Sequence, residues 1–212
     1  MTNRRFGTRA PLVTNARHGW KAKVQIREHV MAELGAERTI VFDAFAGAGI
    51  MWREVWSRAA GYVGCDERWH NDERRCFVAD NRRVLRCIDL APFTIFDADA
   101  YGSPWEALLI IAARRKIQPG ERIALVLTEG TSLKTRWGSQ LPNALSEAAG
   151  LTRAAARGAG RVHDEIIGRA LAGVVDRMGG RIVRQWRAMG TTTAAVRYLG
   201  VVLEGQREAV SA

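Results

Sequence analysis

The amino-acid sequence predicts a single α/β domain built on a mostly parallel β-sheet. Five short apolar runs, each typical of a buried parallel strand, recur between residues 39 and 127, and segments with helical periodicity lie between several of them. Two longer strand-like runs near the C-terminus are joined by the short segment 190–193, which indicates an antiparallel pair. A chain of 212 residues is long enough for one domain with a substantial core.

The individual elements follow from the spacing of apolar residues. A first helix spans Trp20 to Leu34, and Gly35 ends it. We expect strands at 39–42, 61–65, 76–79, 93–96 and 123–127, helices at 50–59, 104–116, 142–149 and 163–178, and a final strand pair at 181–189 and 194–203. Residues 1–19 form a basic N-terminal segment, residues 20–205 the domain, and residues 206–212 a C-terminal tail.

The distribution of charge indicates contact with nucleic acid. The net charge is +10. The first 27 residues contain no acid and seven basic side chains, which are Arg4, Arg5, Arg9, Arg17, Lys21, Lys23 and Arg27. A second acid-free cluster contains Arg153, Arg157 and Arg161. Such clusters suit a phosphate backbone, where each contact releases counterions. The alternative is a solvated basic tail and a solvated helix face.

Composition also excludes several classes of protein. No apolar stretch approaches the roughly 20 residues that span a bilayer, and the N-terminus has no apolar signal region. The three cysteines, Cys65, Cys76 and Cys87, form no CxxC pair, and the histidines share no metal-ligand spacing. We therefore expect a cytoplasmic protein with no metal site and no membrane partner.

Acidic side chains recur where the predicted strands end, at Asp43, Asp66, Asp80, Asp97, Asp99 and Glu129. Each of them taken singly is a typical helix cap. Their repetition over five strands favours a ligand site instead, because the carboxyl ends of parallel strands meet at one edge, where such sheets bind ligands.

The glycine-rich segment DAFAGAG, residues 43–49, allows close approach of backbone to a ligand. It matches neither GxGxxG nor the Walker phosphate loop. Asp66 ends the next strand, at the place from which a carboxylate accepts both hydroxyls of a ribose. Asp80, followed by Asn81, ends the strand after that, where its carboxylate can accept from an adenine amine.

In this order, VFDAFAGAG, VGCDE, VADN and FDADAYGSP resemble the motifs of class I S-adenosylmethionine-dependent methyltransferases, over roughly residues 39–130. The resemblance implies a Rossmann-like seven-stranded sheet with strand order 3-2-1-4-5-7-6 and an antiparallel C-terminal strand. It implies S-adenosyl-L-methionine as cofactor. The implied cofactor contacts are Asp43, Phe45, Gly47 and Gly49 for the methionine part, Asp66 for the ribose, and Asp80 and Asn81 for the adenine.

The segment DADAYGSP, residues 97–104, is similar to a motif of the tRNA guanine-N2 dimethyltransferase family, with Ala100 where that family has proline. The resemblance implies methylation of an exocyclic base amine, with catalytic roles for Asp97, Asp99 and Tyr101. Such an amine is a poor nucleophile. Acceptance of its N–H by Asp99 and a neighbouring carbonyl would orient it and disperse its developing charge, while Tyr101 stacks on the base.

The remaining substrate contacts are expected from residues that follow strands four and five, namely Gly102, Ser103, Pro104, Lys134 and Arg136. The sequence therefore predicts a methyltransferase for an exocyclic base amine in nucleic acid, with RNA slightly favoured over DNA. Two alternatives remain, a DNA adenine methyltransferase and a catalytically silent Rossmann-type nucleic-acid-binding protein. At the level of residues, the alternative is that Asp99 caps the following helix and Tyr101 only packs.

Overall fold

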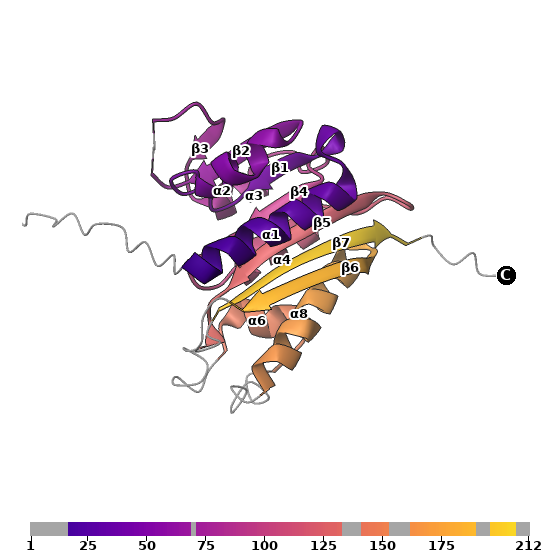
Figure 1. The fold of residues 1–212 in the computed structure, drawn as a ribbon. Coiled ribbons are helices and arrows are strands. Elements are labelled where there is room, and N and C mark those ends of the chain that lie inside the picture. The colour runs from indigo at the N-terminus through magenta and orange to yellow at the C-terminus, as the bar shows by residue number, and fades with distance from the viewer. Residues whose placement is uncertain (1–16, 69–70, 133–140, 153–161, 190–195, 207–212) are drawn as a thin grey trace, which may run out of the picture.

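The computed structural model describes residues 17–68, 71–132, 141–152, 162–189 and 196–206. Within them, seven strands form one sheet in the order β3-β2-β1-β4-β5-β7-β6 (Figure 1). The strands are β1 (Ile40–Asp43), β2 (Gly61–Asp66), β3 (Cys76–Val78), β4 (Ile95–Ala98), β5 (Arg122–Glu129), β6 (Gly180–Met189) and β7 (Arg197–Gly205). Strand β7 runs antiparallel to β5 and β6, and the other pairs are parallel. The predicted fold class and strand order are confirmed.

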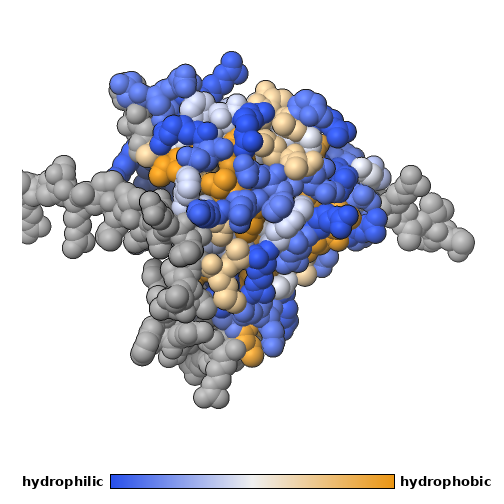
Figure 2. Space-filling model, in the orientation of Figure 1, coloured by the Kyte–Doolittle hydropathy of each residue, from blue (hydrophilic) through white to orange (hydrophobic). Residues whose placement is uncertain are grey.

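Helices cover both faces of the sheet (Figure 1). They are α1 (Arg17–Leu34), α2 (Ile50–Glu54), α3 (Asn81–Cys87), α4 (Trp105–Arg114), α6 (Asn143–Ala148) and α8 (His163–Met178), with short 3-10 helices η1 (Ala36–Arg38) and η2 (Trp56–Arg58). One buried cluster joins α1, α2 and η2 to one sheet face, and a larger one joins α3, α4, α6 and α8 to the other. On the face shown in Figure 2, hydrophobic residues are scattered among mostly hydrophilic ones.

The alternation of side chains along the strands determines which polar groups face α1. Val41, Ile95 and Val126 belong to the cluster beneath α1. Because side chains repeat every second residue along a strand, Asp43 and Asp97 point to the same face. These two aspartates are direct neighbours across the β1–β4 pair. The sheet thus places its acids beneath the basic helix α1.

The structure differs from the sequence-based expectations most clearly at two predicted elements and one additional helix. The helix expected at 50–59 ends at Glu54, because Val55 leaves the helical conformation (φ −132°) and η2 follows. The strand expected at 93–96 lies two residues later, at β4, so that Asp97 belongs to the strand rather than to the loop after it. Helix α3 was not predicted, since only Val84 and Leu85 of its seven residues are buried.

Candidate active site at the carboxyl edge of the sheet

Two adjoining pockets lie at the carboxyl ends of β1, β2 and β4, and Phe45 lines both of them. The larger has a volume of about 410 Å³ and the smaller about 170 Å³. The larger pocket contains Asp66, Asp80, Asn81, Ala100, Tyr101 and Ser103 among its lining residues, and the smaller contains Lys23, Asp43, Gly47 and Asp99. The structure therefore brings most of the predicted cofactor-binding residues together with Asp99 and Tyr101 around the turn that follows β1.

The glycine-rich turn after β1 has a conformation that requires glycine. Gly47 and Gly49 have φ angles of 46° and 75°, in the left-handed region. A Cβ atom on Gly49 would lie 2.7 Å from the guanidinium carbon of Arg74. That guanidinium donates to the carbonyls of Ala46 and Gly47 at 3.0 and 2.9 Å. Arg74 was not singled out in the sequence, because it lies between strands and far from the turn along the chain.

Two carboxylates also hold this turn. Asp66 Oδ2 accepts from the Gly47 N–H at 2.9 Å, and Asp43 Oδ1 accepts from the Phe45 N–H at 3.1 Å. The Tyr62 hydroxyl donates to Asp43 Oδ2 at 3.0 Å. Burial raises the pKa of Asp43, and the nearby negative charge of Asp97 raises it further. Asp43 thus fixes the backbone of the turn at Phe45, and Asp66 fixes it at Gly47.

Asp80 and Asn81 lie at the start of α3, beside the larger pocket. Asp80 is the N-cap of this helix and accepts from the Arg82 N–H at 2.8 Å. The Arg82 side chain also donates to the Asp80 carboxylate, which lowers the pKa of Asp80 to about 2. The Asn81 amide donates to the Ala44 carbonyl at 2.9 Å, so α3 is tied directly to the turn after β1.

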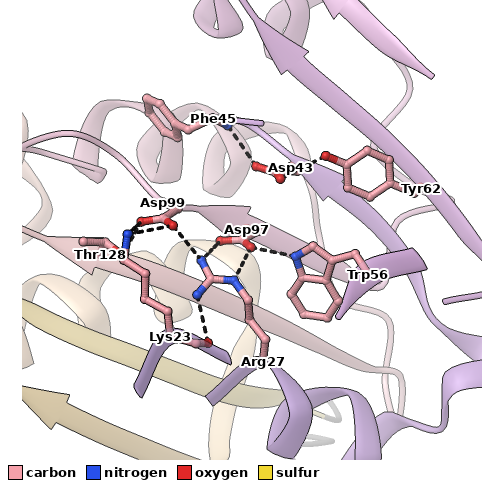
Figure 3. Close-up of polar contacts among 9 residues, drawn as sticks. All are labelled: Lys23, Arg27, Asp43, Phe45, Trp56, Tyr62, Asp97, Asp99 and Thr128. Carbon is pink, nitrogen blue, oxygen red and sulfur yellow. Dashed lines mark hydrogen bonds and ion pairs between the residues drawn. The ribbon is translucent and has the colours of Figure 1, made fainter. Parts of the chain in front are cut away.

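Asp97 lies inside the protein and does not line either pocket. Its oxygens accept from Arg27 Nε at 2.7 Å, from Arg27 Nη2 at 2.8 Å and from Trp56 Nε1 at 2.8 Å (Figure 3). Asp97 and Arg27 are each only 1% exposed. The carboxylate that the sequence places among the catalytic residues is therefore an acceptor that fixes Arg27 beneath α1.

Asp99 lines the smaller pocket and is surrounded by donors (Figure 3). Lys23 Nζ lies 2.7 and 2.9 Å from its two oxygens, and the Thr128 hydroxyl donates to Oδ1 at 2.6 Å. Arg27 Nη2 lies 3.3 Å from Oδ2. Burial opposes ionisation of Asp99, but Arg27 and Lys23 outweigh it and hold the pKa of this carboxyl below its usual range.

The structure corrects the interpretation of two basic residues in α1. The sequence groups Lys23 and Arg27 with a nucleic-acid-binding segment, but both side chains point at the sheet and pair with Asp97 and Asp99. No local signal marks this pairing, because 70 or more residues separate the partners. Arg4, Arg5 and Arg9 and the cluster Arg153, Arg157 and Arg161 lie outside the described residues.

The loop from β4 to α4 carries the rest of the motif. Tyr101 is 85% exposed and lines the larger pocket. The residue at the N-cap of α4 is Pro104, and no side chain caps this helix, so the alternative of Asp99 as its cap is wrong. Ser103 lines the same pocket, and Gly102 has a φ of 124°. Lys134 and Arg136 lie outside the described residues.

The described residues contain neither a metal-binding group nor a membrane-spanning helix. No group of three or more His, Cys, Asp or Glu side chains in the described part of the chain is arranged to hold a metal ion. Among the described helices, none has the combined length and apolar character of a membrane span.

Comparison with known proteins supports the fold. No protein-family model matches the sequence, and no matching curated protein was found. Among solved structures, Trm1 from Pyrococcus horikoshii, in complex with S-adenosyl-L-methionine, superposes with a TM-score of 0.59 and 15% identity. The match covers 90% of this chain and 56% of the Trm1 chain, so the chain spans little more than half the length of that relative.

Two further structures are similar over most of both chains. The N-methyltransferase NodS from Bradyrhizobium japonicum, in complex with S-adenosyl-L-homocysteine, has a TM-score of 0.54 and 10% identity, and covers 89% of this chain and 87% of its own. A 1,6-didemethyltoxoflavin-N1-methyltransferase from Burkholderia thailandensis has a TM-score of 0.50 and 16% identity, and covers 90% and 82%. With the observed strand order, these likenesses show that the chain has the fold of the class I S-adenosylmethionine-dependent methyltransferases.

Proposed function

We propose that this chain is an S-adenosylmethionine-dependent methyltransferase that acts on an exocyclic base amine in nucleic acid. The observation that carries the proposal is the position of the segment 99–101. Asp99 lines the smaller pocket, while Ala100 and the exposed Tyr101 line the larger one. A partly buried acceptor and an exposed aromatic ring therefore lie close together in the sequence, at the two pockets that share Phe45.

The residues present fit the proposed cofactor. Acids follow two successive strands at the larger pocket, and we assign the ribose hydroxyls to Asp66 and the adenine to Asp80. The glycine-rich turn and Asp43 line the smaller pocket, which suits the methionine part. When bound, S-adenosylmethionine supplies a methyl group on a positively charged sulfur.

The roles of the protein side chains follow from their chemistry. Asp99 is held ionised by its cationic neighbours, so it can accept an N–H of the target amine and orient the nitrogen lone pair. Its negative charge also stabilises the positive charge that grows on the attacking nitrogen. The Tyr101 ring is free to stack on the base, because the side chain is almost fully exposed.

The choice of nucleic acid as substrate rests on two observations. The segment DADAYGSP is similar to the motif of a tRNA-modifying family, and the net charge of +10 favours association with phosphates. We propose RNA before DNA for the first reason. A DNA adenine methyltransferase would use the same site, so the two are separated by the product and not by the structure.

The test is mass spectrometry of nucleosides. Total RNA and genomic DNA are incubated with the purified protein and methyl-deuterated S-adenosylmethionine, then digested and analysed. We expect a labelled methyl group on an exocyclic amine of RNA nucleosides. Label on adenine in DNA alone would favour the DNA enzyme, and label on a ring nitrogen, a carbon or a ribose would contradict an amine substrate.

The catalytically silent alternative keeps one observation in its favour, since Asp99 is already surrounded by donors from the protein itself. Calorimetry separates the two. A protein that binds RNA and gives no heat with S-adenosylmethionine or S-adenosylhomocysteine would belong to the silent class.

A further inference from the structure

Donors of the protein already contact both oxygens of the Asp99 carboxylate. Oδ1 accepts from Lys23 and Thr128, and Oδ2 accepts from Lys23 and forms an ion pair with Arg27 (Figure 3). A carboxylate offers about four lone-pair sites, so these three hydrogen bonds occupy most of them. A substrate amine must therefore compete with these donors for Asp99.

The three donors differ in their freedom to move. The Arg27 side chain is 1% exposed and makes a two-pronged pair with Asp97. Thr128 is buried on the central strand β5, with strands paired on both sides. The Lys23 side chain is 17% exposed, ends a flexible four-carbon stem, and lines the smaller pocket. Lys23 is therefore the donor that can leave.

The lysine cation has a second contact besides Asp99. Lys23 Nζ lies 5.6 Å from the centre of the Tyr198 ring, within the range of a cation–π interaction. Because this contact does not involve Asp99, the ammonium group can keep it when its hydrogen bonds to Asp99 are lost.

We propose that Lys23 is a positioning residue that holds the place of the substrate amine on Asp99. Its ammonium nitrogen and the amine nitrogen are alternative N–H donors to the same carboxylate oxygens. Before substrate binds, Lys23 keeps Asp99 ionised and oriented, and it yields when the amine arrives. This inference rests on the proposed function. It extends that function by naming Lys23 as the group that competes with the target amine for Asp99.

Competition of this kind predicts a specific change in kinetics. The apparent affinity for substrate is reduced by the fraction of protein in which Lys23 still occupies Asp99. We expect Lys23→Ala to lower the KM for nucleic acid about twofold to fivefold, the range that the free energy of a solvent-accessible ion pair allows. Lys23→Arg should raise KM, because the guanidinium fork binds a carboxylate through two parallel hydrogen bonds.

A binding experiment tests the place-holder without any methyl transfer. Ethylammonium is the probe, since it carries the same ammonium head as lysine. Ligand-observed NMR should detect binding of ethylammonium to the Lys23→Ala variant. It should detect no binding to the native protein or to the double variant Lys23→Ala, Asp99→Asn. Tetramethylammonium, which has the same charge but no N–H donor, should bind to none of the three.

The control variant is Arg38→Ala, which removes one positive charge from an exposed side chain at the opposite edge of the sheet. It should change neither KM nor ethylammonium binding. Lys23→Met, which keeps the length of the stem, replaces Lys23→Ala if the latter does not fold. A higher KM in the folded variant, or no specific ethylammonium binding, would overturn the inference. Should the native protein transfer no methyl group, the proposed function fails, and the NMR comparison still decides the role of Lys23.

Discussion

Asp97 and Asp99 stand two residues apart in the same motif, yet their surroundings give them different tasks. Both point beneath α1, but Asp97 lies under the helix and is 1% exposed, whereas Asp99 lies beyond the end of β4 and lines a pocket. The sequence groups both as catalytic because their partners, Arg27 and Lys23, come from a distant segment. Of the two carboxylates, only Asp99 lines a pocket.

Asp99→Asn should lower turnover by about 10²-fold or more, because the variant loses the charge that stabilises the transition state. Affinity for S-adenosylhomocysteine should change less than turnover, since the proposed ribose and adenine contacts, Asp66 and Asp80, lie in the other pocket. Single-turnover methyl transfer on the native substrate measures the effect. Asp89→Asn, the same change at an exposed position, is the matched control. Near-native rates for Asp99→Asn would contradict the catalytic role.

Asp66→Ala should weaken binding of S-adenosylhomocysteine by about 1.5–3 kcal/mol, the usual value of hydrogen bonds to a charged group. The variant loses both the proposed ribose acceptor and the bond that Asp66 accepts from the Gly47 N–H. Calorimetry gives the affinity, and circular dichroism checks that the fold is kept. An unchanged dissociation constant in a folded variant would exclude Asp66 as a ribose contact.

At the scale of elements, α1 contributes more than its apolar face. Its Arg27 side chain places a buried cation against Asp97, so the helix is joined to the sheet by an ion pair as well as by Ile26 and Val30. A buried charge that loses its partner is costly, since neither water nor another ion replaces the lost contact.

Arg27→Met should therefore reduce the free energy of unfolding by about 3–5 kcal/mol in urea denaturation. Arg58→Met is the matched control. Arg58 of η2 pairs at 3.1 Å with Glu28, which lies on α1 like Arg27, but the Arg58 side chain is largely exposed. An exposed pair of this kind contributes about 0–1 kcal/mol. Equal losses in the two variants would show that burial of the Arg27–Asp97 pair has no special weight.

An element can be predicted from the sequence to the extent that residues close together in the chain determine it. The strands and long helices were predicted because their apolar spacing is strong, as in β5, whose residues 123–129 are all buried. Helix α3 was not, because it is short and rich in arginine. The early end of α2 follows from a tertiary contact, as the chain turns at Val55 and Trp56 donates to Asp97. No spacing rule in the sequence contains that contact.

The candidate site was predictable in outline for a related reason. The acids that end β1 and β2 and the glycine turn are local features, and parallel strands necessarily bring them to one edge. The cations that surround the acids are not local. Arg74, which donates to the turn, and Lys23, which donates to Asp99, are brought to the site by tertiary structure alone.

At the scale of the whole molecule, we propose that the basic side chains ahead of α1 contact phosphates, because the sequence places three arginines and no acid there. Deleting residues 1–16, which precede α1, removes Arg4, Arg5 and Arg9. We expect weaker binding to RNA and a slope of log affinity against log salt that is shallower by about 2 to 3. Affinity for S-adenosylhomocysteine, measured on the same preparation, should not change. An unchanged salt slope would mean that this segment makes no phosphate contacts.

The charge count beneath α1 has a consequence for proton uptake and release. Asp43, Asp97 and Asp99 are three carboxylates facing two cations, and the raised pKa of Asp43 makes it the one that keeps a proton as pH rises above about 4. A cationic ligand in the smaller pocket supplies the missing positive charge and should expel that proton into the buffer. Binding of S-adenosylmethionine should then strengthen as pH rises, and its calorimetric heat should vary with the ionisation enthalpy of the buffer. Asp43→Asn should remove that variation, whereas its persistence would assign the released proton to another group.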